Sequence, residues 1–156
     1  MSGQPEYPGF FVFDVPNLAV EEIGGMILPP QTIIPAGQDF KVYGTFTFTD
    51  WVAHFFHELM AAAGPTPDWE AKYYAEELGG ANDIVLGTVR GDLAATGFFP
   101  IVNHSYTTPD TDLIVTGGIT LPGTYRLTCT VTCLGGGVTP LPITGFHEGP
   151  MIQIHV

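Results

Sequence analysis

Basic residues are scarce in this sequence. Its 156 residues include four Lys and Arg against 16 Asp and Glu, which gives a formal net charge of −12. Nucleic-acid binding requires clustered basic side chains that neutralise phosphates, and attraction to anionic lipid requires them as well. The composition therefore predicts that neither nucleic acid nor a membrane surface is a partner.

Serine is nearly absent too, which narrows the choice of enzymatic mechanisms. The chain has only Ser2 and Ser105, and it contains no nucleophile elbow, P-loop or dinucleotide-binding fingerprint. Ser105 follows His104 directly, and adjacent side chains of a strand point to opposite faces, which is wrong for a nucleophile and its base. We expect a protein that is not an enzyme and that has no cofactor, unless a divalent metal binds as described below.

The only two cysteines, Cys129 and Cys133, lie in one short run, TLPGTYRLTCTVTC. Four residues of strand rise about 13 Å, whereas bridged cysteines have Cα atoms about 4.4 to 6.8 Å apart. The run therefore predicts a half-buried strand with two free thiols in a structural role. Its period-two alternation places five side chains toward the core: Tyr125, Leu127, Cys129, Val131 and Cys133.

We expect neither a leader nor a membrane span. The N-terminus has no basic region ahead of an apolar stretch, and no apolar run approaches the roughly twenty residues that cross a bilayer. Together with the unpaired thiols, this favours the cytoplasm. The length suits one domain over residues 1–156.

Most of the chain alternates as strands do. Phe40 and Val42 share the apolar face of a strand over 39–49, and GPMIQIHV at the C-terminus places Ile152, Ile154 and Val156 on one face. The segment 8–30 predicts two short strands or an edge segment. The segment 69–89 fits either a second helix or a hairpin; its Gly-Gly turn favours the hairpin, with Ile84, Leu86 and Thr88 on one face.

One segment departs from the strand pattern. Asp50 can cap a helix, and apolar residues then recur at helical spacing until Gly64 and Pro65 end the pattern. We therefore expect a short helical insertion over 50–64, with an apolar stripe that meets another surface. The residues of this predicted interface are Trp51, Phe55, Phe56, Leu59 and Met60.

Two groups of residues are candidate metal ligands. On the expected helix, His54, His57 and Glu58 project from the face opposite the stripe, where two imidazoles and a carboxylate can bind a divalent metal. A solvated polar face is the simpler explanation of these three residues. Asp110 and Asp112, with Asn103, offer oxygens to calcium, although aspartate is also a common turn residue.

Short strands separated by Gly and Pro turns are typical of an antiparallel β-sandwich. The run LPGTYRLT resembles the tyrosine corner of immunoglobulin-like and fibronectin type III-like sandwiches, in which a Tyr bonds back to the upstream backbone. The resemblance implies an antiparallel immunoglobulin-like β-sandwich with Tyr125 as a structural residue. Leu127 stands where antibody domains carry a cysteine, so the disulfide-bonded branch is not expected.

These observations favour a non-catalytic protein interaction or assembly module that binds itself, as a homo-oligomer, or another protein. Only 13% of residues are charged and the mean hydropathy is +0.24, which is high for a soluble monomer of this size. Two alternatives stay open: a metal-binding protein, and a small-ligand or carbohydrate binder that uses an aromatic face formed by Trp69, Tyr73 and Tyr74.

Overall fold

Every regular element that the structure describes is a β-strand. The computed structural model describes residues 12–23, 33–49, 68–92, 105–107, 112–135 and 139–156. The all-β prediction is confirmed for these ranges. The helix expected over 50–64 lies outside the described residues.

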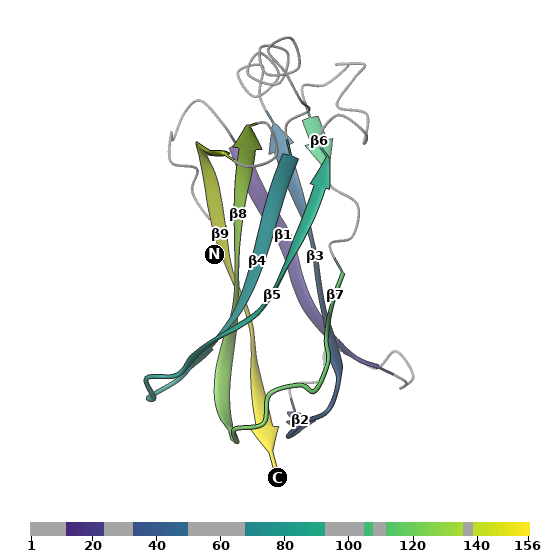
Figure 1. Ribbon diagram of the computed structural model, residues 1–156, viewed down its shortest axis with the longest axis vertical. Coiled ribbons are helices and arrows are strands. Elements are labelled where there is room, and N and C mark those ends of the chain that lie inside the picture. The colour runs from purple at the N-terminus through teal and green to yellow at the C-terminus, as the bar shows by residue number, and fades with distance from the viewer. Residues whose placement is uncertain (1–11, 24–32, 50–67, 93–104, 108–111, 136–138) are drawn as a thin grey trace.

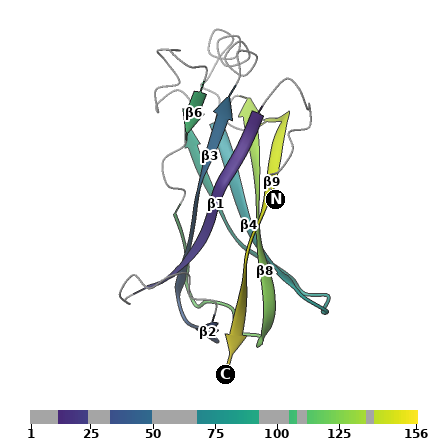
Figure 2. The same ribbon diagram turned by 180° about the vertical axis from the view of Figure 1, so that it is seen from behind.

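The strands form two sheets. The four-stranded sheet contains β1 (Val12–Glu22), β3 (Phe40–Thr49), β6 (Ser105–Thr107) and β7 (Leu113–Val115), with β3 at its centre. The five-stranded sheet has the order β2 (Ile33–Pro35), β9 (Thr139–His155), β8 (Gly123–Gly135), β4 (Asp68–Glu77) and β5 (Asp83–Asp92). Figures 1 and 2 show the two sheets as layers that face each other along the length of the molecule.

Strand direction differs from the expectation at one place. All pairings of the four-stranded sheet are antiparallel, and so are β4 with β5, β4 with β8, and β8 with β9. The short strand β2 instead runs parallel to β9, with Ile34 opposite Ile154. The prediction of a purely antiparallel arrangement is wrong here, because alternation identifies a strand but says nothing about the direction of its partner.

The described part of the N-terminal segment forms one strand of 11 residues, β1, at the edge of the four-stranded sheet. The expected edge segment is confirmed there, and the alternative of two short strands is not. Its pairing with β3 shifts register between Asp14 and Asn17. Pro16 lies within this shift, and proline has no backbone N–H to donate to a ladder. A proline therefore interrupts the pairing locally without ending the strand.

The hairpin predicted over 69–89 is confirmed as β4 and β5. Gly79 occupies the turn with φ 83°, a conformation that favours glycine. The register then shifts at Gly87, so that Val89 packs against the core where Thr88 was expected, and Thr88 is exposed. A side chain at Gly87 would come within 2.9 Å of Leu113 on β7, so glycine allows the two strands to approach.

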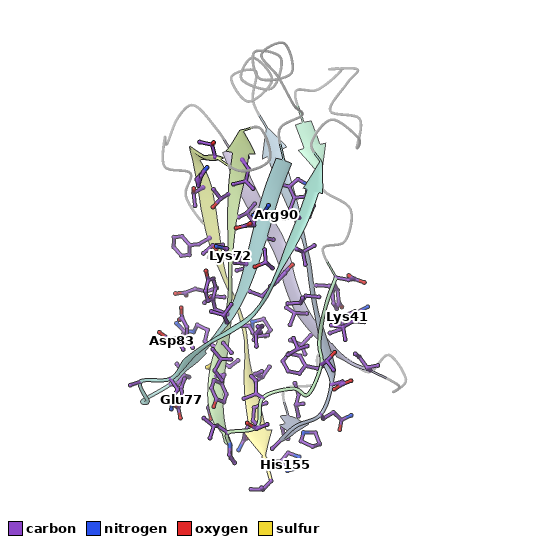
Figure 3. All side chains as sticks on the ribbon, viewed as in Figure 1. Lys41, Lys72, Glu77, Asp83, Arg90 and His155 are labelled. Carbon is purple, nitrogen blue, oxygen red and sulfur yellow. The ribbon has the colours of Figure 1, made fainter. Side chains whose placement is uncertain are left out.

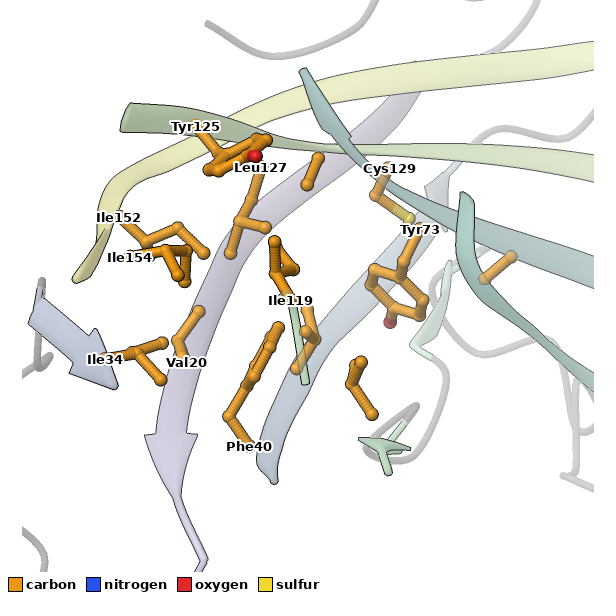
Figure 4. Packing of buried hydrophobic residues seen from close by; sticks show 14 of the residues in the cluster. Val20, Ile34, Phe40, Tyr73, Ile119, Tyr125, Leu127, Cys129, Ile152 and Ile154 are labelled. Carbon is orange, nitrogen blue, oxygen red and sulfur yellow. The ribbon is translucent and has the colours of Figure 1, made fainter. Parts of the chain in front are cut away.

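The core lies between the sheets and draws side chains from both, as Figure 4 shows. The strand expected at the cysteines is β8, and its five inward side chains are at most 3% exposed. Phe40 and Val42 of β3 are fully buried, and Ile152 and Ile154 of β9 are 1% and 2% exposed. Val156, expected on the same face, is fully exposed because the strand ends at His155.

Candidate binding site on the outer face of the five-stranded sheet

Most of the metal and interface residues predicted from the sequence lie outside the described residues. They are His54, His57, Glu58, Asn103, Asp110 and the stripe formed by Trp51, Phe55, Phe56, Leu59 and Met60. Asp112 is described; its Oδ2 lies 3.5 Å from Nζ of Lys41, in an exposed ion pair. Within the described ranges, no three His, Cys, Asp or Glu side chains are grouped so that they could hold a metal.

Trp69, Tyr73 and Tyr74, which were expected to form one aromatic face, lie on the two opposite faces of β4. Trp69 and Tyr73 are 3% and 1% exposed and belong to the core. Tyr74, the next residue along β4, points away from the core and is half-buried. The grouping of the three into one ligand-binding face is therefore wrong, because strand alternation separates neighbouring residues.

A depression of about 490 Å³ lies on the outer face of β5, β4, β8 and β9. Apolar side chains, hydroxyls and carboxylates all contribute to it. The lining residues are Tyr74, Glu76, Asp83, Val85, Thr128, Thr130, Phe146 and Glu148.

Cross-strand register explains how these residues meet. Tyr74 on β4 is opposite Val85 on one side and Thr128 on the other. Thr128 in turn is opposite Glu148 on β9, so one row crosses four strands from Val85 to Glu148. Directly opposite residues have Cβ atoms about 4.5 to 5.5 Å apart, which places such a row in continuous contact.

An irregularity in β9 decides which of its residues reach this face. The pairing of β8 with β9 shifts between Arg126 and Thr128, so that Gly149 and Pro150 oppose a single residue of β8. Unbroken alternation would place Phe146 on the same side as the buried Ile152. The shift turns Phe146 outward instead, where it is 47% exposed.

Polar contacts hold the acidic side chains of the depression. Thr128 Oγ1 lies 3.3 Å from Oε1 of Glu76 and donates a hydrogen bond to it. Arg126 Nη1 lies 3.6 Å from Oε2 of Glu148, as an ion pair at the margin of the depression.

A second polar cluster lies on the same face, closer to the other end of β4. Glu70, which is 9% exposed, accepts a hydrogen bond of 2.6 Å from Nε of Arg90, and its carboxylate lies 3.2 Å from Nζ of Lys72. Burial raises the pKa of Glu70, but hydrogen bonds from Arg90 and Lys72 outweigh this and hold the pKa below its usual range. Figure 3 shows Lys72 and Arg90 at a distance along the hairpin from Asp83 and Glu77.

The two thiols are unsuited to chemistry. Cys129 and Cys133 are free and buried. Burial raises the pKa of each to about 12, and for Cys129 a hydrogen bond with Tyr73 offsets this only in part. A reactive cysteine is instead exposed and has a lowered pKa, because the thiolate is the nucleophile.

Comparison with known proteins assigns the chain to no family. No family model matches it, and no curated protein matches its sequence. Among solved structures it is similar to the C-terminal domain of Wzt, with 13% identity, a TM-score of 0.48, and coverage of 98% of this chain and 83% of that one. It is also similar to a Niemann-Pick type C2 protein from the Japanese carpenter ant, with 8% identity, a TM-score of 0.41, and coverage of 99% and 94%.

Proposed function

We propose that the protein is a non-catalytic interaction module that binds a protein partner at the depression on the outer face of β5, β4, β8 and β9. The observation that carries this proposal is the exposure of large apolar side chains next to carboxylates and hydroxyls on the outer face of the five-stranded sheet. Phe146 and Val85 are 47% and 63% exposed, and they lie on either side of the half-buried Tyr74.

The arrangement matches the anatomy of protein interfaces. Such interfaces have an apolar centre in which aromatic residues are enriched, and a polar rim. Here Tyr74, Phe146 and Val85 supply the centre, while Glu76 and Glu148 supply part of the rim. An immunoglobulin-like sandwich, which the bond between Tyr125 and the backbone of Leu121 supports, presents such a face on a rigid scaffold. Rigid scaffolding reduces the entropy lost on binding.

Self-association is a separate proposal that rests on the sequence. The stripe from Trp51 to Met60 must be covered, and a second copy of the chain can cover it. The depression is lined by other residues, so substitutions in one set do not decide the role of the other. The metal-binding alternative likewise rests on the sequence, with ligands either within residues 54–58 or at Asp110 and Asp112. Removal of metal by a chelator tests it through the oligomeric state.

Selection from a display library of random peptides tests the proposal. The full chain is the bait, and the double variant Val85→Ser, Phe146→Ser is the counter-bait, because it removes the exposed apolar centre without touching the core. A matched control, Ile114→Ser, removes an apolar side chain that is 59% exposed on β7 of the other sheet. We expect peptides that bind wild type and the control but not the double variant. Peptides that bind all three proteins equally would overturn the proposal.

A further inference from the structure

The charges in the depression point to the chemistry of its ligand; this inference rests on the proposed function. Of the eight lining residues, Glu76, Asp83 and Glu148 are acidic and none is Lys or Arg. Glu76 and Glu148 lie two residues along their strands from Tyr74 and Phe146, and Asp83 is opposite Glu76. A concave surface lined by one sign of charge raises the local concentration of groups of the opposite sign.

The chain has no spare Lys or Arg to neutralise these carboxylates. Each of its four basic residues forms an ion pair: Lys41 with Asp112, Lys72 and Arg90 with Glu70, and Arg126 with Glu148. Only the pair of Arg126 with Glu148 reaches the depression. Asp83 forms no ion pair with any residue that the structure describes. The acidic surplus of the depression therefore remains available to an incoming cation.

We infer that the depression binds a segment of a partner protein that carries lysine or arginine together with apolar side chains. The apolar side chains contact Phe146 and Val85, and the cationic groups reach the carboxylates of Glu76 and Asp83. The ring of Tyr74 favours the same ligand, because aromatic faces attract ammonium and guanidinium groups. Within the chain, the guanidinium of Arg126 already forms an ion pair with the carboxylate of Glu148. A basic side chain of the ligand would pair with a carboxylate of the depression in the same way.

A second copy of this chain fits the depression poorly. In a two-fold symmetric contact the same patch occurs on both subunits. Glu76, Asp83 and Glu148 of one copy would then approach the same residues of the other. Like charges that face each other across an interface oppose association. The charge pattern favours a different protein as the partner.

Defined peptides test the inference. The probes are a synthetic peptide of alternating lysine and leucine, and its counterpart with glutamate in place of lysine. Isothermal titration with the full chain should show binding of the lysine peptide only, and the affinity should fall as salt is added, because exposed charge pairs are screened. Equal affinity for both peptides, or binding of neither, would overturn the inference.

Matched charge variants locate the binding. Glu76→Gln with Asp83→Asn should weaken binding of the lysine peptide by about tenfold, as expected for two rim charges. Asp39→Asn with Asp112→Asn changes the net charge equally, away from the depression, and should alter the affinity by less than about twofold at physiological salt. Equal losses would mean that only net charge matters, and the inference would fail. If library peptides require Val85 and Phe146 but show no excess of basic residues, the proposed function stands and the ligand class is wrong.

Discussion

The hydroxyl of Tyr125 donates a hydrogen bond of 3.0 Å to the carbonyl oxygen of Leu121, four residues earlier in the chain. The tyrosine ring is fully buried, so the bond ties the corner before β8 to the core. Burial raises the pKa of this hydroxyl, with a smaller contribution from Glu77, and it therefore stays a donor at neutral pH.

Tyr125→Phe should lower the free energy of unfolding by about 1 to 3 kcal/mol, because it leaves the Leu121 carbonyl without this donor. Urea unfolding followed by tryptophan fluorescence measures the change. Tyr74→Phe removes a hydroxyl from the outer face and should stay within about 0.5 kcal/mol of wild type. A Tyr125→Phe protein as stable as wild type would remove the tyrosine-corner assignment.

Both cysteines should resist thiol reagents in the native protein. Cys129 and Cys133 are buried, and at neutral pH their raised pKa values leave almost no thiolate. Titration with a chromogenic disulfide reagent should give no fast reaction in buffer and two equivalents in denaturant. A fast equivalent in the native protein, or fewer than two after denaturation without reductant, would contradict the buried free-thiol structure.

The same burial predicts a loss of stability in alkali. Folding raises the pKa of each thiol from 9.0 to about 12. The contribution of each thiol to stability is therefore complete below pH 9 and decreases progressively as the pH rises to 12. Between these limits the free energy of unfolding should fall by about 1.4 kcal/mol per pH unit for each thiol. Urea midpoints between pH 8 and 10.5 measure the slope. The double variant Cys129→Ala, Cys133→Ala should show a clearly shallower slope than wild type.

The ion pairs of Glu70 predict the opposite behaviour in acid. Folding lowers the pKa of Glu70 below its usual value of 4.5. The contribution of Glu70 to the free energy of unfolding is therefore present above pH 4.5, and it is lost as the pH falls through the pKa of the folded protein. Glu70→Gln should cost about 1 to 3 kcal/mol at pH 7, as for a charged hydrogen bond, and much less at pH 3. Glu76→Gln, on the exposed part of the same strand, is the control. Equal cost of Glu70→Gln at both pH values would show that shape, not charge, stabilises this position.

The self-association proposed for the stripe has its own test. Phe55→Asp with Phe56→Asp should yield a folded protein of lower apparent mass, because charges oppose burial of the stripe against a second copy. Sedimentation velocity and circular dichroism measure mass and folding, and Ile114→Ser, at an exposed apolar residue of β7, is the control. A wild-type chain that sediments as a monomer at high micromolar concentration would refute assembly. An unfolded double variant would instead indicate that the stripe covers its own sheet.

Local patterns were enough to predict several strands and their inward faces. The run from Tyr125 to Cys133 alternates without interruption, and all of its predicted core residues are buried. The hairpin of β4 and β5 was likewise predictable, since Gly79 and Gly80 supply turn chemistry between two alternating runs. Side-chain alternation and turn propensity depend on neighbouring residues only, so the sequence contains them directly.

Side-chain alternation and turn propensity could not predict the candidate binding site. Simple alternation along β9 places Phe146 on the buried side with Ile152, and only the register shift at Gly149 and Pro150 turns it outward. The Gly-Pro pair is the one local signal of that shift, since proline favours a bulge over a regular ladder. A bulge reverses the relation between the faces on its two sides, so one position changes the prediction for many residues of the strand.

The sequence by itself determined the all-β character of the described ranges, the inward side of β8 and the shortage of Lys and Arg. Tertiary structure alone decided the full strand order of the two sheets, the parallel pairing of β2 with β9, and the meeting of Tyr74, Phe146 and three carboxylates on one face. The reason is physical. Alternation arises from the geometry of a single strand, whereas register and strand order depend on packing between residues that lie far apart in the chain.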